Sequence, residues 1–164
     1  YDVVMDELKL AYLAGVMDSD GTFTIGVGTT RVVKLKQSPA YYESVTLGQV
    51  QTEAIKLAQE LFGGSIGLQK PRGKIQQRPI YRWQVTGRLA SVVTKALYPY
   101  LRIKRDRAAV LIRLREIKDR PRKMKTDLVR PKVRVLSDST LTEMRGLVQE
   151  IRKLNGTARL LSFS

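Results

Sequence analysis

The sequence contains neither cysteine nor histidine. Without cysteine, disulfide bonds, thiolate-bound zinc and thiol nucleophiles are all excluded. Without histidine, the chain lacks the commonest general base and the commonest ligand of transition metals. Any catalytic chemistry must therefore use carboxylates, lysine, tyrosine, hydroxyl groups or a hard metal ion bound by oxygen.

Long apolar runs are also missing from the sequence. No stretch approaches the roughly 18 apolar residues of a membrane-spanning helix, and the first residues lack the basic-then-apolar order of a signal peptide. We therefore expect a soluble, intracellular protein with no membrane partner. The chain has 164 residues, 43% of them hydrophobic, which is enough for one domain with its own core.

Acidic residues are scarce. The chain has 30 Lys and Arg residues against 15 Asp and Glu residues, a net charge of +15. Between Leu61 and Arg105 there is no acidic residue at all. This balance favours a polyanionic partner such as nucleic acid, although a basic segment can equally be an ordinary solvated face.

The hydrophobic pattern predicts alternating helices and strands. Leu10, Leu13, Ala14 and Met17 form one helical face, and Phe23, Ile25 and Val27 one strand face. This order predicts an α+β fold with an αββαββα core, an antiparallel sheet and additional C-terminal helices. The expected elements are a helix over 6–17, strands over 22–27 and 41–49, a helix capped by Thr52 and ending at 61 or 62, strands over 65–70 and 77–85, and helices over 88–97 and 105–118.

The C-terminal part has a different composition from the rest. We expect a single domain over 1–164, with its core at about 6–118 and a basic connection followed by a last helix in 119–164. Thr140 and Glu143 have the spacing of a capping box, which predicts the start of that helix. Asn155 and Gly156 predict its end. The basic connection could contact flanking phosphates or simply wrap around the fold.

Asp18 and Asp20 directly precede Gly21 at the end of the first predicted helix. A pair of aspartates followed by glycine could open an EF-hand calcium loop. Such a loop needs a glutamate about eleven positions after its first ligand, where this chain has Thr29, and its fifth position is Thr22. A calcium loop of this type is therefore disfavoured.

Ala11, Gly15 and Ser19 are four residues apart and form a helix stripe with almost no side chains. Such a stripe lets another helix approach closely, either within the chain or from the same helix of a second subunit. A two-fold contact would bring two Asp20 carboxylates together, which is costly unless a divalent cation lies between them. Mg²⁺ suits oxygen ligands and requires neither histidine nor cysteine.

The segment LAGVMDSDG, residues 13–21, resembles the motif of the LAGLIDADG homing endonuclease family. The order of elements, the Gly63-Gly64 pair and the segment YPYLRIKR at 98–105 also resemble that family, so the resemblance covers about 6–118. It implies a saddle-shaped sheet, a homodimer of the single-motif type and cleavage of double-stranded DNA. The residues that fit the motif are Leu13, Ala14, Gly15, Asp18, Asp20 and Gly21.

The resemblance also implies roles for individual residues. Asp20 would be the metal ligand, helped by the backbone carbonyl of Ser19, while Asp18 would be structural. Lys104 would be the active-site basic residue that stabilises the charged transition state or polarises water, and Gln49 the polar residue that organises water. Without the resemblance, an aspartate before a glycine is more often a cap or turn residue.

The sequence departs from the family pattern just after Gln49. Some relatives carry a further basic residue there, whereas this chain reads Val50, Gln51, Thr52 and Glu53. A second water-organising residue is therefore not assigned, and Gln51 is only a weak candidate.

The polar faces of the predicted strands are candidates for DNA contact, because alternate residues of a twisted sheet can follow the major groove. Arg78 and Arg82 are expected to read guanine, and Gln69 and Gln84 to read adenine directly or through water. The first strand contains two glycines, so DNA shape or water would do part of its reading. The strand candidates are Thr24, Gly26, Gly28, Thr30, Ser44, Thr46, Gln69, Arg78, Ile80, Arg82 and Gln84, and the phosphate-contacting loop candidates are Arg31, Lys34, Lys36, Arg72 and Lys74.

The sequence thus predicts a homodimeric, Mg²⁺-dependent endonuclease that cuts a long pseudo-palindromic DNA site and is encoded in a mobile intron. One alternative is an RNA maturase or a non-cleaving DNA-binding regulator on the same fold, neither of which needs Asp20. A ribosomal or nucleoid protein is a further alternative that composition alone allows.

Overall fold

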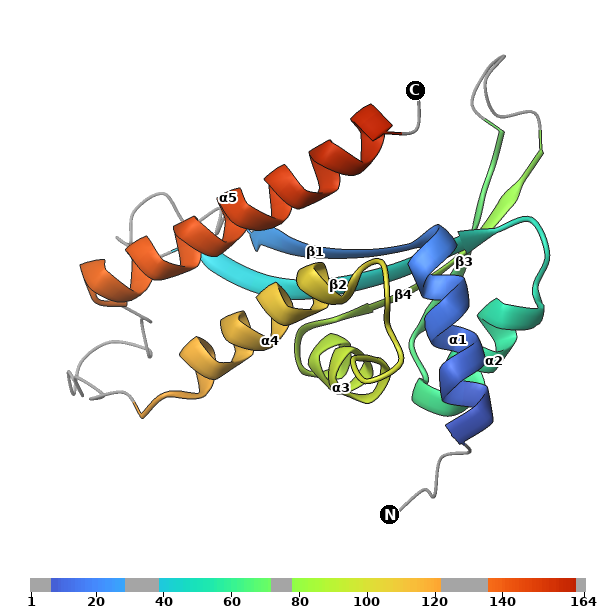
Figure 1. The fold of residues 1–164 in the computed structure, drawn as a ribbon, viewed down its shortest axis with the longest axis horizontal. Helices are drawn as coiled ribbons and strands as arrows, with labels where there is room; N and C mark the ends of the chain where they lie inside the picture. Colours follow the sequence, from blue (N-terminus) through green and yellow to red (C-terminus); the bar gives the residue numbers. More distant parts are fainter. Residues whose placement is uncertain (1–6, 29–38, 72–77, 122–135, 162–164) are drawn as a thin grey trace, which may run out of the picture.

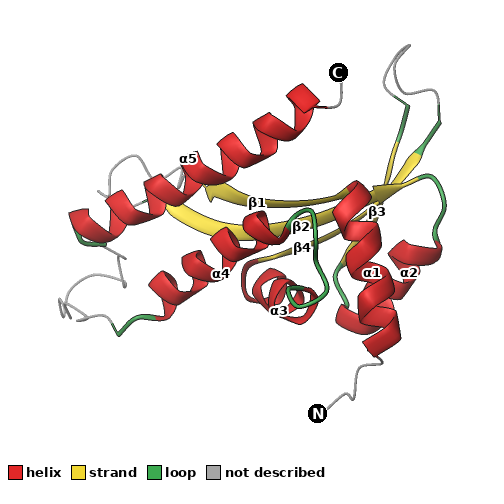
Figure 2. Ribbon diagram, in the orientation of Figure 1, coloured by secondary structure: helices red, strands yellow, loops and turns green. Residues whose placement is uncertain are grey.

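The structure is a computed structural model that describes residues 7–28, 39–71, 78–121 and 136–161, with side chains as far as residue 156. Figure 1 shows α1 and α4 in front of the strands and α3 below them, and Figure 2 shows the strands side by side in one sheet. The predicted α+β fold and its αββαββα order are confirmed. The elements are α1 (Glu7–Asp20), β1 (Gly21–Gly28), β2 (Ala40–Gln49), α2 (Glu53–Phe62), β3 (Ser65–Gln69), β4 (Ile80–Thr86), α3 (Gly87–Leu97), α4 (Arg105–Asp119) and α5 (Asp138–Leu161).

The four strands form an antiparallel sheet in the order β1-β2-β4-β3. Two hairpins, β1-β2 and β3-β4, meet along β2 and β4 in the centre. The register places Phe23 opposite Val45, and Val45 opposite Val85. Because side chains alternate along a strand, these three residues form one apolar row on the face that the helices cover, and all three are buried.

Helix α1 lies against the sheet through the predicted face. Leu10, Leu13, Ala14 and Met17 are all buried, as the helical spacing predicts. Burying a large apolar side chain of this kind contributes roughly 1.5–3 kcal/mol each. The contact therefore fixes the helix whose last residue is Asp20.

Helix α2 ends at the glycine pair for a steric reason. Gly63 and Gly64 both have positive φ, at 74° and 95°, which other residues rarely adopt. A Cβ atom on Gly64 would lie 2.6 Å from Cγ1 of Val85, and Nε1 of Trp83 donates to the Gly63 carbonyl at 2.8 Å. The predicted helix end is confirmed, but Thr52 at the other end makes no side-chain capping bond.

One buried charge was not predicted from the sequence. Glu43 of β2 points to the helix side of the sheet and is fully buried. Its Oε2 accepts from Nη2 of Arg115 and from Nζ of Lys118, both at 2.9 Å. A buried carboxylate needs such partners, so this cluster ties α4 to β2.

The last helix starts differently from the prediction. Helix α5 begins at Asp138, and Ser137 rather than Thr140 is its cap: Oγ of Ser137 accepts from the amide of Thr140 at 3.3 Å. The side chain of Glu143 bonds to Arg120 of the preceding segment at 3.0 Å instead of capping the helix. The predicted capping box is therefore wrong, because tertiary pairing takes its glutamate.

The predicted end of that helix is also wrong. Helix α5 passes through Asn155 and Gly156 and continues to Leu161. Oδ1 of Asn155 accepts from Nε of Arg107 at 3.0 Å, and Nδ2 donates to the carbonyl of Phe23 at 3.1 Å. The asparagine thus links α5 to α4 and β1 and does not act as a stop signal.

Val27, which the sequence predicts on the inner strand face, and Leu68 of β3 are both exposed. Val27 is 40% exposed and Leu68 57% exposed, and each lies near the end of its strand. Figure 1 shows the β3-β4 hairpin continuing beyond the helices. In the parts of the chain described above, no helix is both long and apolar enough to cross a bilayer.

Candidate active site and nucleic-acid interface

The first aspartate of the motif, Asp18, is built into the fold. Its side chain is only 8% exposed. Oδ2 accepts from the amide of Arg102 at 2.7 Å, and Oδ1 from the amide of Lys104 at 2.8 Å. These amides lie just before α4, where backbone donors lack helical partners, so Asp18 fixes the approach to α4 against the end of α1.

The glycine of the motif permits a sharp change from helix to strand. A Cβ atom on Gly21 would lie 2.4 Å from Cε and 2.7 Å from the carbonyl oxygen of Met17. Any larger residue would therefore collide with the last turn of α1. Asp20 stands at this corner, as the last residue of the helix.

Asp20 itself is exposed and has polar neighbours. Its Oδ2 accepts from Nε2 of Gln49 at 3.1 Å, and its Oδ1 from Oγ of Ser19 at 3.1 Å. An ionised carboxylate has about four acceptor positions, so acceptor capacity remains. The structure thus brings together Asp20 and Gln49, which are 29 residues apart and are both candidate active-site residues in the sequence.

Lys104 reaches the same corner but binds to the backbone. Its Nζ donates to the carbonyl oxygens of Met17 at 3.1 Å, Ser19 at 2.8 Å and Gly21 at 2.7 Å. An ammonium group has three donors, and all three are used here. Carbonyls at the end of a helix lack helical partners and carry partial negative charge, so the lysine caps the end of α1.

The charge environment of Lys104 contains opposing contributions. Burial lowers the pKa of Lys104 below its usual 10.5, and the nearby charge of Arg107 lowers it further, while Asp18 and Asp20 raise it. The three carbonyl acceptors bind the protonated form. In this structure all three donors of the ammonium are directed to backbone carbonyls; the role in catalysis that the resemblance implied stays a prediction.

The bare stripe on α1 is exposed. Ala11, Gly15 and Ser19 all face outward, and a Cβ atom on Gly15 would meet nothing within 4 Å. The neighbouring Tyr12 is 55% exposed. No described residue of the chain therefore packs against this stripe at Gly15. The hollow beside it, of about 440 Å³, is lined by Ala11, Tyr12, Gly15, Val16, Ser19, Asp20 and Gln49.

The sheet face opposite the helices carries small polar residues in its middle. The register places Thr24, Ser44 and Thr86 side by side across β1, β2 and β4. Ser44 is only 6% exposed, so its hydroxyl is the least accessible of the predicted contact residues in this row. The next row consists of Thr22, Thr46, Gln84 and Ser65.

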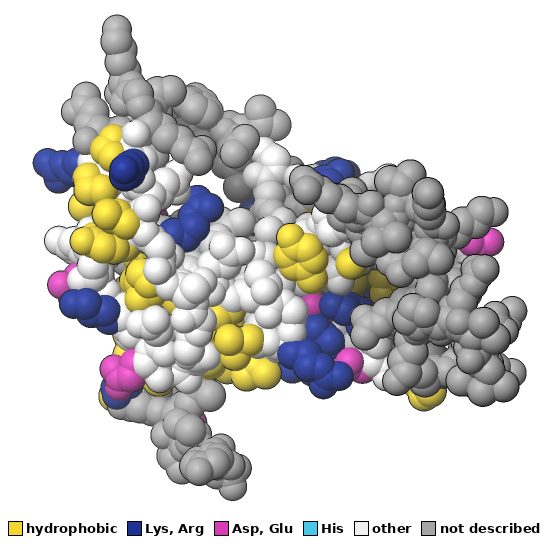
Figure 3. All heavy atoms as spheres, turned by 180° about the vertical axis from the view of Figure 1, so that it is seen from behind, with side chains coloured by type: hydrophobic (Ala, Val, Ile, Leu, Met, Phe, Trp, Pro, Cys, Tyr) yellow, Lys and Arg dark blue, Asp and Glu magenta, His cyan; other side chains and the backbone are white. Residues whose placement is uncertain are grey.

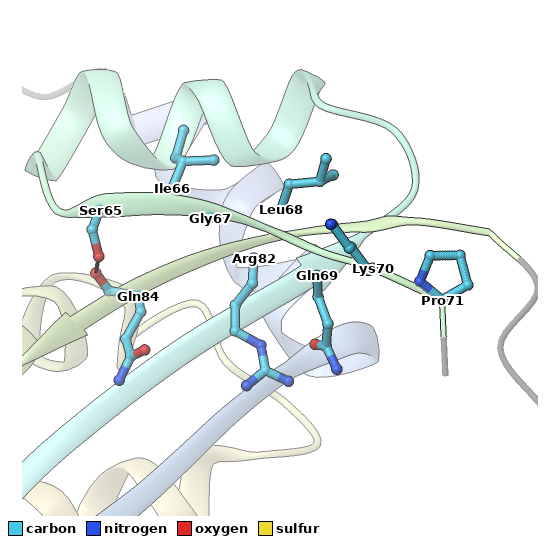
Figure 4. Close-up of a pocket in the computed structure, with 9 residues that line it drawn as sticks. All are labelled: Ser65, Ile66, Gly67, Leu68, Gln69, Lys70, Pro71, Arg82 and Gln84. Carbon is cyan, nitrogen blue, oxygen red and sulfur yellow. Dashed lines mark hydrogen bonds between the residues drawn. The ribbon is translucent and has the colours of Figure 1, made fainter. Parts of the chain in front are cut away.

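Longer side chains lie towards β3 and β4. Arg82 has a glycine on each side, Gly48 on β2 and Gly67 on β3, so neighbouring side chains do not crowd its guanidinium. Figure 4 shows Arg82, Gln69 and Gln84 pointing away from α2, opposite to Ile66 and Leu68. These residues line a shallow hollow of about 570 Å³ together with Ser65, Gly67, Lys70 and Pro71.

The remaining predicted contact residues fall into two groups. Ile80 pairs with Gln69 at the end of this face, and Arg78 is exposed just before β4. Seen from behind, the molecule shows groups of basic side chains between uncharged surface (Figure 3). Thr30, Arg31, Lys34, Lys36, Arg72 and Lys74 lie outside the described residues.

One large residue of the open face was missed. Tyr42 shares the face with Ser44 and Thr46, because side chains alternate along β2. Its position two residues before Ser44 is the only sequence signal that places Tyr42 on the open face. The strand prediction assigned no role to Tyr42. The two glycines of β1, Gly26 and Gly28, lie on the same face.

Comparison with known proteins gives matches among solved structures alone, since no protein-family model and no curated protein matches the sequence. The homing endonuclease I-CvuI in complex with the I-CreI target is 22% identical, with 90% of this chain and 82% of that chain covered and a TM-score of 0.63. The archaeal intron-encoded homing endonuclease I-Vdi141I complexed with DNA is 14% identical, with 92% and 86% covered and a TM-score of 0.64.

A third similar structure is a much longer chain. The I-SmaMI LAGLIDADG homing endonuclease bound to cleaved DNA is 18% identical, with 85% of this chain but 42% of that chain covered, at a TM-score of 0.57. This chain thus corresponds to less than half of I-SmaMI but to most of I-CvuI and I-Vdi141I. The chain has the fold of the LAGLIDADG homing endonucleases.

Proposed function

We propose that the protein is a site-specific endonuclease that cuts double-stranded DNA as a homodimer, using a divalent cation. The observation that carries this proposal is the position of Asp20. Its exposed carboxylate lies at the end of α1, directly before β1 and in the hollow beside the bare stripe, and Gln49 donates to it. A binding protein on this fold has no need for an exposed carboxylate beside a DNA-facing surface.

The donor set around Asp20 suits a hard cation such as Mg²⁺. Asp20 offers carboxylate oxygens with capacity to spare, which such ions prefer. The carbonyl of Ser19 is a poorer ligand than the sequence indicated, because Nζ of Lys104 already donates to it at 2.8 Å. In the parts of the chain that the structure describes, no group of three or more acidic residues could hold a metal. The remaining ligands would then be water, DNA phosphate and the same carboxylate of a second subunit.

When bound, such a cation supplies positive charge for the scissile phosphate and favours ionisation of water. The residues of the chain orient the reaction around it. Nε2 of Gln49 holds Asp20, which leaves the amide oxygen of Gln49 to accept from a water molecule and to direct it towards the phosphate. Lys104 holds the corner between α1 and β1, so that Asp20 keeps its position.

The open sheet face would bind the DNA, with Arg82 as a reader of guanine. We expect Arg82→Ala to weaken binding to the preferred site about 10- to 100-fold, since a good bidentate contact gives roughly 1–3 kcal/mol of discrimination. Titration of labelled duplexes measures this loss. The same variant should discriminate less at one base pair of each half-site.

Arg88 provides the matched control for this substitution. It is an exposed arginine on α3, with its guanidinium 4.0 Å from Asp119 on α4. Arg88→Ala should leave the affinity within about twofold, because Arg88 lies on α3 and a side chain that neutralises no phosphate releases no counterion on binding. Equal losses in both variants would mean that DNA binds through overall charge and not through this face.

The homodimer would form through the exposed stripe of α1. Gly15 lies in the middle of that helix, and alanine is more favourable than glycine in a helix interior by roughly 0.5–1 kcal/mol. In a monomer, Gly15→Ala should therefore stabilise the protein. If two α1 helices meet closely at Gly15, we expect the substitution to weaken association instead, measured by sedimentation equilibrium.

Gly146 of α5 is the control for helix propensity. It is exposed within its helix, and a Cβ atom there would also meet nothing within 4 Å. Gly146→Ala should raise the unfolding temperature without changing association. A Gly15→Ala variant that behaves like Gly146→Ala would refute the proposed dimer contact.

The proposed activity is tested with a library of random duplexes incubated with the wild-type protein and Mg²⁺. We expect cut ends from one family of pseudo-palindromic sequences, and no such ends when a chelator is present. Recovery of bound duplexes that are never cut would favour the non-cleaving regulator. Tighter binding to structured intron RNA than to any duplex would favour the maturase.

A further inference from the structure

The open face of β1 is nearly bare, apart from a tyrosine that lies over it from the neighbouring strand. Tyr42 of β2 stands directly opposite Gly26 of β1. A Cβ atom built on Gly26 would lie 2.2 Å from Cζ and 2.6 Å from the hydroxyl oxygen of Tyr42. The phenol ring therefore occupies the space that a side chain at position 26 would fill.

The same ring extends towards the second glycine of β1. A Cβ atom on Gly28 would lie 3.9 Å from Cε1 of Tyr42. The other open-face residues of these two strands, within the described parts, are short: Thr22, Thr24, Ala40, Ser44, Thr46 and Gly48. Tyr42, which is 38% exposed, is thus the one long polar side chain that this half of the face presents.

We propose that Tyr42 is a specificity-determining residue, which reads a base edge in place of the side chains that Gly26 and Gly28 lack. The inference rests on the proposed DNA-cleaving function and assigns a long polar side chain to the part of the face where β1 has only glycines. A phenol hydroxyl can both donate and accept a hydrogen bond, and every base pair presents such groups in the major groove.

The register also predicts where the contact lies on the DNA. Gly26 is five residues beyond Gly21, which follows Asp20, and a strand rises about 3.3 Å per residue. Tyr42 is therefore about 17 Å along the strand from the end of α1, where Asp20 lies. Bases are spaced about 3.4 Å apart, so the base pair read by Tyr42 is about five pairs from the scissile phosphate.

A purely structural role makes a different prediction. An aromatic residue opposite a glycine stabilises a strand pair by covering it, and for that role the hydroxyl is not needed. Tyr42→Phe keeps the ring and removes the hydroxyl. Tyr81→Phe is the matched control, because Tyr81 alternates with Arg82 and so lies on the helix side of β4.

The test measures relative cleavage of a panel of targets that carry every single base-pair substitution of the half-site. We expect Tyr42→Phe to discriminate less at one or two adjacent base pairs, about five pairs from the scissile phosphate. The loss should be about threefold to tenfold, because that ratio corresponds to the free energy of one hydrogen bond. Gly26→Ala should give the same local loss, since its Cβ displaces the ring. Tyr81→Phe should match the wild type at every position.

Each outcome decides between the proposals. A Tyr42→Phe profile identical to that of the wild type at every position, with the wild type still discriminating among targets, overturns the role of Tyr42 and leaves the proposed function standing. A uniform loss at all positions also overturns it. If the wild type itself neither cuts nor discriminates among duplexes, the proposed function fails, and the inference fails with it.

Discussion

Replacing Asp20 by asparagine is expected to abolish DNA cleavage while DNA binding persists. The variant keeps the size of the side chain but removes the charge that a divalent cation requires. We expect a fall in the cleavage rate on the order of 10³-fold or more, comparable to the loss of a charge-stabilising group in other active sites. Because Asp20 is exposed, the free energy of unfolding should change by less than about 0.5 kcal/mol. Single-turnover cleavage and thermal unfolding measure the two effects.

Asp18→Asn is the matched control, two residues away in the same helix. The carboxylate of Asp18 accepts from two backbone amides, at 2.7 and 2.8 Å. Asparagine offers a single acceptor oxygen, so one amide would face an NH₂ group, and we expect a loss of roughly 1–3 kcal/mol of stability. Full cleavage by Asp20→Asn, or equal destabilisation by both variants, would contradict the roles assigned to the two aspartates.

Replacing Lys104 by methionine is expected to destabilise the fold and impair cleavage together. The substitution leaves the carbonyl oxygens of Met17, Ser19 and Gly21 without their donor. Hydrogen bonds to charged groups contribute about 1.5–3 kcal/mol, so we expect a loss of that size in the free energy of unfolding. Denaturant titration measures it, and cleavage of a bound duplex measures the effect on the site.

Two further variants define the role of this lysine. Lys104→Arg should not restore stability, because a planar guanidinium cannot direct its donors to three carbonyls that converge on one point. Lys95→Met, on the exposed side of α3, should be neutral. A Lys104→Met variant with unchanged stability and no cleavage would instead show that the lysine acts directly on the phosphate, as the resemblance implied.

The parts of the fold that the sequence predicts best are those determined by local pattern. The buried face of α1 follows from the spacing of Leu10, Leu13 and Met17, and the glycine pair after α2 follows from its conformational freedom. The start of α5 was misplaced because Glu143 pairs with Arg120 across the fold. A local signal cannot show that a distant arginine takes the capping residue.

Some features of the candidate site could be predicted from the sequence, and others could not. The choice of Asp20 and Gln49 as candidate site residues follows from the family resemblance, and the structure shows a hydrogen bond between them. The three backbone contacts of Lys104 could not be predicted, since they depend on how the segment before α4 approaches the end of α1. Tyr42 was overlooked for a similar reason, because its importance comes from the glycines opposite it and not from its own position.

The central property proposed for the chain is cleavage of both strands of a duplex at the site it binds. The most direct measurement places a single selected site on a plasmid, adds wild-type protein with Mg²⁺, and maps the ends of both strands. We predict a linear product whose two ends lie within the bound site, formed only with a divalent cation. A plasmid that is bound at that site yet stays intact with every divalent cation would contradict the claim.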